Sequence, residues 1–175
     1  FVPNHVAREY HSTCRPKGVE DLGATDNPAW AFSPLNNFYY IHEPFAPYFD
    51  IQGYSESPAR ATGNDCFTAH PSKDDWYETI KLNYGVFYQN GGEQQFDPIP
   101  NTWHKMLDIL LFWANKGIDG FRCDMAEMVP QAFWSWAISH VKAQYPELLF
   151  IAEVYNPQLY RDYIAAGFDY LYDKV

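Results

Sequence analysis

The chain has 175 residues, of which 47% are hydrophobic and 19% charged, an ordinary composition for a globular protein with a sizeable core. Its formal net charge of −10 makes nucleic acid and anionic membranes poor partners. No apolar run approaches the roughly 20 residues that a membrane-spanning helix needs. Aromatic residues reach 19%, which suits either dense core packing or platforms for flat ligands such as sugar rings.

The amino-terminal part of the chain combines a strand-like beginning with a long irregular stretch. "FVPNH", residues 1–5, starts in mid-strand, which suggests a piece of a longer protein. Residues 6–98 hold most of the Pro, Asn and Gly and show no sustained period. A structureless loop of that length is improbable in a compact domain. We therefore expect an inserted lobe with short strands of its own.

The remaining part of the chain alternates regularly between helix and strand patterns. Apolar residues at helical spacing, with cap and stop signals, predict three helices: 101–116, 131–145 and 156–167. Short apolar runs predict three strands: 118–124, 148–152 and 168–172. Such alternation is typical of parallel βαβ units, so the sequence predicts the α/β class.

Polar side chains stand at the ends of three predicted strands. In parallel α/β sheets and barrels, reactive groups collect at the carboxyl ends of the strands. The residues in question are Asn4 and His5, Arg122 and Asp124, and Glu153. Singly, each has an ordinary structural explanation: a buried ion pair, a helix cap, or a core histidine. Together they favour a site.

Asp124 and Glu153 are one βαβ repeat apart, because 153 − 124 gives 29 positions. Neighbouring strands lie about 4.8 Å apart, so the two carboxyl groups can approach to around 5 Å. This separation suits a retaining glycosidase, in which one carboxylate attacks and the other acid protonates the leaving oxygen. We expect one carboxyl to stay ionised and the other to be held protonated. Arg122 shares the strand face of Asp124 and would keep that carboxylate charged.

Several of these segments resemble a known family. "FVPNH" (1–5), "GFRCDMAEM" (120–128) and "FIAEVYN" (150–156) resemble, in the right order, conserved segments of the α-amylase family, glycoside hydrolase family 13. "IKLNYG" (80–85) resembles a fourth segment, of the neopullulanase and cyclomaltodextrinase type.

The resemblance implies a partial TIM (β/α)8 barrel, about strands 3 to 6, with an irregular lobe inserted after the first strand of the chain. Residues 1–5 and 99–175 would form the barrel part, and 6–98 the lobe. It also implies that Asp124 is the nucleophile and Glu153 the general acid/base. Arg122 and His5 would bind substrate, and Asn4 is a candidate calcium ligand.

Two departures from the family pattern matter. Many calcium-binding amylases have Lys-His where Glu127 and Met128 stand, so a calcium requirement is expected to be weak; Glu127 is counted among the substrate-binding candidates. The family's third aspartate lies on a later strand, beyond Val175. We therefore expect the 175 residues alone to be inactive and the rest of the barrel to lie outside them.

The expected activity is retaining hydrolysis or transfer on α-1,4-glucans or maltooligosaccharides, without an organic cofactor. A non-catalytic carbohydrate-binding relative is the alternative, and it would be marked by loss of Asp124 or Glu153. A metal-dependent hydrolase would need a fuller set of ligands than His5 and the two carboxylates provide.

Overall fold

The computed structural model describes residues 1–9 and 17–172, and the chain divides into two compact units. One unit, here called the sheet unit, consists of Phe1–Asn4 and Trp103–Val175. The other, the lobe, is His5–Thr102. The sequence placed the lobe at 6–98. In the described ranges, no helix is both long enough and apolar enough to cross a membrane.

The sheet unit is built on three parallel strands in chain order: β7 (Gly120–Cys123), β8 (Leu149–Glu153) and β9 (Tyr170–Tyr172). The start of the chain lies along the edge of β7 that faces away from β8. There the Phe1 nitrogen donates to the Arg122 carbonyl at 2.8 Å, and the Asp124 amide donates to the Phe1 carbonyl at 2.9 Å. The predicted α/β class is confirmed, and within the described residues no sheet closes into a barrel.

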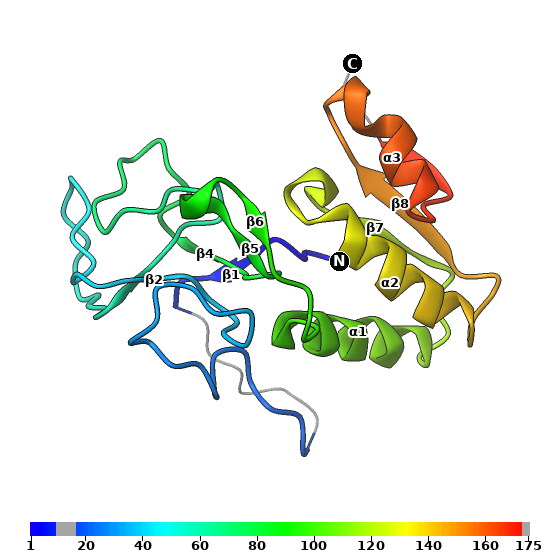
Figure 1. Ribbon diagram of the computed structural model, residues 1–175, viewed down its shortest axis with the longest axis horizontal. Coiled ribbons are helices and arrows are strands. Elements are labelled where there is room, and N and C mark those ends of the chain that lie inside the picture. Colours follow the sequence, from blue (N-terminus) through cyan, green and yellow to red (C-terminus); the bar gives the residue numbers. More distant parts are fainter. Residues whose placement is uncertain (10–16, 173–175) are drawn as a thin grey trace. The chain divides into compact units, whose positions relative to one another are not determined.

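Helix α1 (Asn101–Ala114) precedes β7, and further helical segments connect the strands (Figure 1). Between β7 and β8 lie η2 (Ala126–Met128) and α2 (Gln131–Lys142), and between β8 and β9 lie η3 (Pro157–Leu159) and α3 (Tyr160–Ala165). Gly117 follows α1 with φ of +80°, a left-handed conformation that suits glycine after a helix end. Helix α2 stops three residues before the predicted 145, because the Gln144 amide bonds to Val141 and tightens the last turn.

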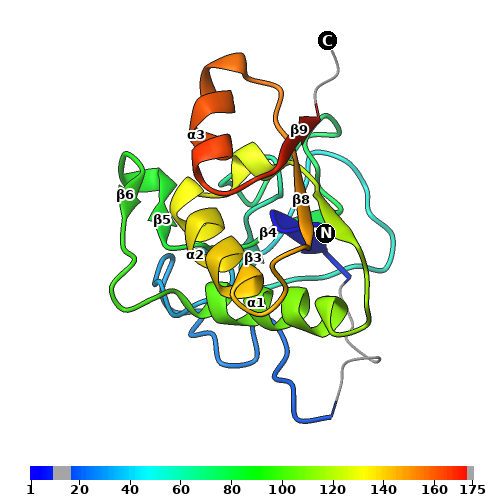
Figure 2. The same cartoon turned by 90° about the vertical axis from the view of Figure 1, so that its right-hand side faces the viewer.

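Aromatic side chains fill the space between the sheet and its helices. Trp134 of α2 and Phe133 beside it are fully buried, and the Trp134 ring meets Phe168 edge-on at 4.8 Å. Phe121 and Phe150 point to the same layer, with ring centroids 5.5 Å apart. Figure 2 shows α2 and α3 on one side of the strands. Burying each such side chain stabilises the unit by about 1.5–3 kcal/mol.

The opposite face of the sheet is open. Side chains alternate along a strand, so the residues between the buried ones point away from the helices. Tyr170 and Tyr172 of β9 are 59% and 45% exposed, and Ile151 between β7 and β9 is half-buried. Arg122 lies on this face as well, with its guanidinium 5.7 Å from the centre of the Tyr172 ring.

Among its described residues, the lobe contains three antiparallel pairs of short strands: β1 (His5–Ala7) with β4 (Thr79–Lys81), β2 (Tyr40–Ile41) with β3 (Ala59–Arg60), and β5 (Val86–Phe87) with β6 (Glu93–Gln94). A 3-10 turn, η1 (Tyr88–Asn90), separates the last two strands. Strands of two or three residues satisfy few backbone groups, so side chains must supply the missing partners.

Arg8 is the clearest of these side-chain partners. Its guanidinium is buried, pairs with Glu56 at 2.8 Å, and donates to the carbonyls of Tyr77 at 2.6 Å and Thr79 at 2.9 Å. Glu56 also pairs with Arg60 at 2.8 Å. This network joins segments far apart in the sequence and takes the place of a longer strand ladder.

Candidate active site

Asp124 and Glu153 lie side by side at the carboxyl ends of neighbouring strands. Arg122 is opposite Ile151 in the β7–β8 register, and Cys123 is opposite Ala152. The next step along both strands brings Asp124 beside Glu153. The structure therefore gives the two carboxylates the relation that the 29-residue spacing predicts.

Arg122 connects the two carboxylates. Its Nη1 donates to Asp124 Oδ1, and its Nη2 pairs with Glu153 Oε1 at 2.7 Å. The Glu153 side chain is 4% exposed, whereas that of Arg122 is 46% exposed. One guanidinium thus orients both acids on the open face of the sheet. The Asp124 hydrogen bond raises the pKa of Arg122 further, so the guanidinium stays charged.

Two further groups hold Glu153. The Met125 amide donates to Oε2 at 2.9 Å, and the Tyr155 hydroxyl donates to Oε1. Met125 has φ of +44°, in the left-handed region, which costs a non-glycine residue about 1–2 kcal/mol. Strain of this kind persists where surrounding contacts demand it, and it is frequent at functional sites.

These contacts decide the charge of Glu153. Burial raises its pKa, but the Tyr155 hydroxyl, the Met125 amide and Arg122 together outweigh burial, so the pKa lies below its usual value. Glu153 is therefore ionised at neutral pH in the ligand-free chain. The expectation that one of the two carboxyls is held protonated stays a prediction; the donors around Glu153 indicate that this carboxyl is not the protonated one in the ligand-free chain.

The Glu127 carboxylate is hydrogen-bonded to the loop that follows β8. Its Oε2 accepts hydrogen bonds from the amides of Tyr155 at 3.1 Å and Asn156 at 3.0 Å. Glu127 thus ties the segment after Asp124 to the segment after Glu153. A contact with substrate remains a prediction for this residue.

Cys123, the residue before Asp124, points to the opposite face. It is fully buried, as expected for a small apolar side chain, and burial raises the pKa of its thiol to about 12. Cys14, which could pair with Cys66, lies outside the described residues.

Asn4, the candidate calcium ligand, is buried in the sheet unit, and its Nδ2 donates to the Met128 sulfur at 3.7 Å. Calcium takes oxygen ligands, and a thioether is a poor substitute. Within residues 1–9 and 17–172 no three His, Cys, Asp or Glu side chains gather as a metal site would require. The contact with Met128 uses the amide nitrogen of Asn4. Calcium binding through its side-chain oxygen remains a prediction.

We expect a chelator such as EDTA to change the melting temperature of the full-length protein very little. A metal stabilises a fold only in proportion to its binding, and Glu127 and Met128 stand where many calcium-binding amylases have Lys-His. Thermal melts with and without EDTA, then with calcium added back, measure this. A fall of many degrees that calcium reverses would contradict the expectation.

His5 belongs to the lobe rather than to the sheet unit. It opens β1 opposite Lys81 of β4, and its ring meets Trp76 edge-on at 5.5 Å between centroids. Its proposed contact with a sugar remains a prediction.

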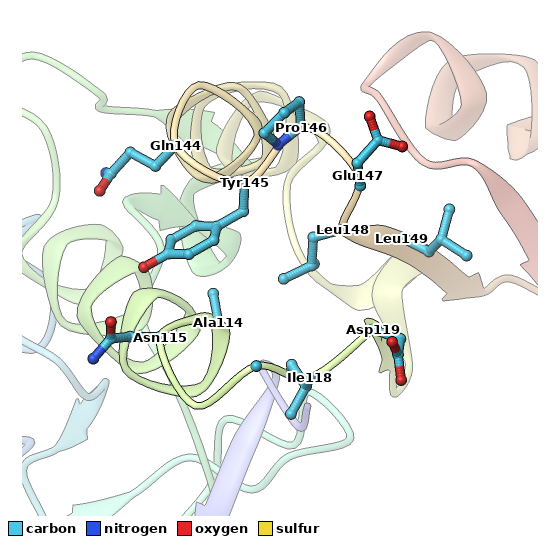
Figure 3. A pocket seen from close by; sticks show the side chains of 11 residues that line it. Ala114, Asn115, Ile118, Asp119, Gln144, Tyr145, Pro146, Glu147, Leu148 and Leu149 are labelled. Atoms are coloured by element: carbon cyan, nitrogen blue, oxygen red, sulfur yellow. The ribbon is translucent and has the colours of Figure 1, made fainter.

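A hollow of about 680 Å³ in the sheet unit lies away from these residues (Figure 3). Its lining includes Ile118 and Asp119, which precede β7, and Leu148, which precedes β8. It therefore opens at the amino ends of the strands, whereas Asp124 and Glu153 follow their carboxyl ends. Four strand residues separate the two places by roughly 13 Å.

Tyr155 and Met125 were missed as functional candidates at the sequence level. Tyr155 stands two positions after Glu153, so strand alternation could have placed it on the same face. The role of Met125 depends on a left-handed backbone conformation, and a methionine in the sequence does not predict that conformation.

Comparisons with known proteins show what the chain is similar to. No family model matches the chain. An α-1,4-glucan:maltose-1-phosphate maltosyltransferase of Chlorobaculum tepidum is 34% identical over 164 residues, covering 86% of this chain and 24% of that protein. The Cereibacter sphaeroides protein of that name is 33% identical over 97 residues, covering 55% of this chain and 14% of that protein. The comparisons confirm the resemblance to the α-amylase family.

This chain spans a quarter or less of the α-amylase family relatives named above. Among solved structures, an α-amylase from Anoxybacillus aligns at 24% identity with a TM-score of 0.44, covering 56% of this chain and 20% of that one.

Proposed function

We propose that this chain carries the catalytic carboxylates of a retaining enzyme that acts on α-glucans. The observation that carries the proposal is the Arg122 bridge between Asp124 and Glu153, on adjacent parallel strands in register. When the two carboxyl groups are close together, no water fits between the carboxylate and the sugar. This arrangement suits direct attack on the sugar by one carboxylate.

The open face of the sheet supports a proposal for the fold of the complete enzyme. We propose that the Phe1 segment, β7, β8 and β9 are the third to sixth strands of a (β/α)8 barrel. The exposed Tyr170 and Tyr172 would then point into the barrel, where the missing strands cover them. The lobe would be the segment inserted after the third strand.

In the proposed first step, the Asp124 carboxylate attacks the anomeric carbon of the sugar and the glycosidic bond breaks. Glu153 donates its proton to the departing oxygen, and a covalent glycosyl-enzyme forms on Asp124. In the second step, Glu153 takes a proton from the incoming hydroxyl, and attack at the same carbon releases Asp124. The resemblance to the α-amylase family also proposes a sugar contact for His5.

The ionised state of Glu153 adds a requirement to this cycle. Before it can act as an acid, Glu153 must gain a proton, and its contact with Arg122 opposes this. A bound sugar would exclude water from the carboxyl group, and it can compete for the Arg122 contact. Both effects raise the pKa of a carboxyl group. We propose that substrate binding itself prepares Glu153.

The incoming hydroxyl decides between hydrolysis and transfer. The two relatives are named maltosyltransferases with α-1,4-glucan and maltose 1-phosphate in their names. We propose α-1,4-glucans or maltooligosaccharides as the substrate class for this protein, with water or a second glucan as acceptor.

The test of the proposed function is the anomeric configuration of the first product. We expect the full-length protein to release the α-anomer from an α-linked maltooligosaccharide, because two displacements at one carbon restore the configuration. Proton NMR in the first minutes of reaction distinguishes the anomers. An initial β-anomer, or no reaction with any α-glucan, would refute the proposal.

Tyr155→Phe should move the pH profile in a defined direction. The Tyr155 hydroxyl lowers the pKa of Glu153, so its removal raises that pKa. A general acid is active below its pKa, so the basic limb of kcat/KM should move to higher pH. Measuring kcat/KM across pH for both proteins tests this. A limb that stays in place or moves to lower pH would contradict it.

A further inference from the structure

The lobe contains a buried lysine whose partner is exposed. Lys81 of β4 has a side chain that is 1% exposed, and its Nζ pairs at 2.5 Å with Oδ1 of Asp65, which is 39% exposed. Nζ also lies 5.1 Å from the centre of the Tyr88 ring. Burying an ammonium group costs several kcal/mol unless its contacts compensate. Burial of the Lys81 ammonium group therefore costs free energy, and its ion pair holds the Asp65 carboxylate at the surface in one position.

The backbone of Asp65 is also in an unfavourable conformation. Its φ is +65°, in the left-handed region that non-glycine residues rarely adopt. A turn that needed only this conformation would be served better by glycine. An aspartate nevertheless occupies this strained position, and its ion pair with Lys81 fixes the direction of the carboxylate.

The turn that carries Asp65 lies against β1 and β4. At Gly63, a β-carbon would stand 2.7 Å from Thr79 Oγ1 and 2.9 Å from the β-carbon of His5, so only glycine allows this approach. The Gly63 amide donates to Thr79 Oγ1 at 2.9 Å. Asn64 follows, and its Nδ2 donates to Asp75 at 3.0 Å.

An aromatic residue and a histidine lie in segments that contact this turn: the Trp76 amide donates to Asn64 Oδ1 at 3.3 Å, and Gly63 lies close to His5. Trp76 is half-buried, follows Asp75, and meets the ring of His5, which is opposite Lys81 in the β1–β4 register. An apolar ring beside fixed polar groups is a usual arrangement for binding a sugar, whose faces are apolar and whose rim carries hydroxyls.

We propose that Asp65 binds sugar hydroxyls in a lobe subsite that it forms with His5 and Trp76. Lys81 is a positioning residue that holds the Asp65 carboxylate. The ligand class is an α-glucan or maltooligosaccharide, so the inference rests on the proposed function. It adds a carboxylate contact that lies outside the three segments carrying the catalytic resemblance.

The experiment measures maltooligosaccharide affinity by calorimetry, in full-length protein carrying Asp124→Asn so that the ligand is not consumed. Asp65→Asn is then added, because asparagine tolerates the left-handed conformation and its amide oxygen can still accept a hydrogen bond from Lys81. The matched control is Asp74→Asn, which removes the same charge from an exposed position in the neighbouring turn. A third protein carries Lys81→Met, which keeps most of the buried volume.

We expect Asp65→Asn to weaken binding by about tenfold or more, as for loss of a hydrogen bond to a charged group. Asp74→Asn should leave binding unchanged, and Lys81→Met should weaken it while Asp65 is still present. If Asp65→Asn lowers the melting temperature but binds like Asp74→Asn, the pair is only structural and the inference is wrong. If Lys81→Met binds normally, the positioning role is wrong.

Failure of the proposed function gives a different result. In that case the parent Asp124→Asn protein binds no maltooligosaccharide, and wild-type protein hydrolyses none. Binding by the parent with equal affinity in Asp65→Asn overturns this inference alone.

Discussion

Replacing Asp124 by Asn or Glu153 by Gln in the full-length protein is expected to lower kcat/KM on maltooligosaccharides by at least about 10³-fold. Asn removes the attacking carboxylate, and Gln removes the proton donor, while both retain the size of the side chain. Steady-state kinetics measure the loss. Asp119→Asn is the matched control, since Asp119 is an exposed aspartate at the other end of β7.

The two substitutions should differ with an activated substrate whose leaving group needs no acid. Glu153→Gln should then form the glycosyl-enzyme and accumulate it, because the second step lacks its base. Asp124→Asn should form none. Mass spectrometry of the digested protein locates the label. A sugar attached to any residue other than Asp124 would overturn the assignment of the nucleophile.

The 175-residue chain by itself is expected to associate in solution and to show no turnover. Its sheet has an open face with Tyr170 and Tyr172 exposed, and within the described residues β9 has a neighbouring strand on one side only. Open edges and uncovered apolar faces pair with other chains. The mass in solution, measured by light scattering across a range of concentrations, shows whether this happens.

A pair of variants tests whether association occurs through the open face of the sheet or through any exposed apolar residue. Tyr170→Lys should reduce association, whereas Ile164→Lys should not, because Ile164 is an exposed residue of helix α3 rather than of the open face. A monomeric chain that turns over maltooligosaccharides at about 10 per second, the median for enzymes, would show that this expectation is wrong.

The sheet and the carboxylate pair could be predicted from the sequence because their signals are local. Each predicted strand is a short apolar run that ends at a polar residue, and the observed β7 and β8 agree with the predictions within two residues at each end. The 29-residue spacing then places Asp124 beside Glu153, since the chain must make one crossover between them.

The charge of Glu153 and the structure of the lobe could not be predicted in this way. The charge depends on the Tyr155 hydroxyl and on the Met125 amide, whose direction is set by one backbone angle. In the lobe, strands of two or three residues are too short to show a period. Its organisation depends on contacts such as that of Arg8 with Thr79, which no spacing rule reveals.

The burial of Cys123 gives the site a built-in chemical reporter. A thiol that is fully enclosed, with a pKa raised to about 12, resists alkylation while its strand stays in place. Cys123 lies in β7, next to Asp124. The rate at which its thiol is alkylated would therefore report the frequency of local opening of β7. The slow modification of one sulfur atom would thus measure how often the strand that carries the proposed nucleophile opens.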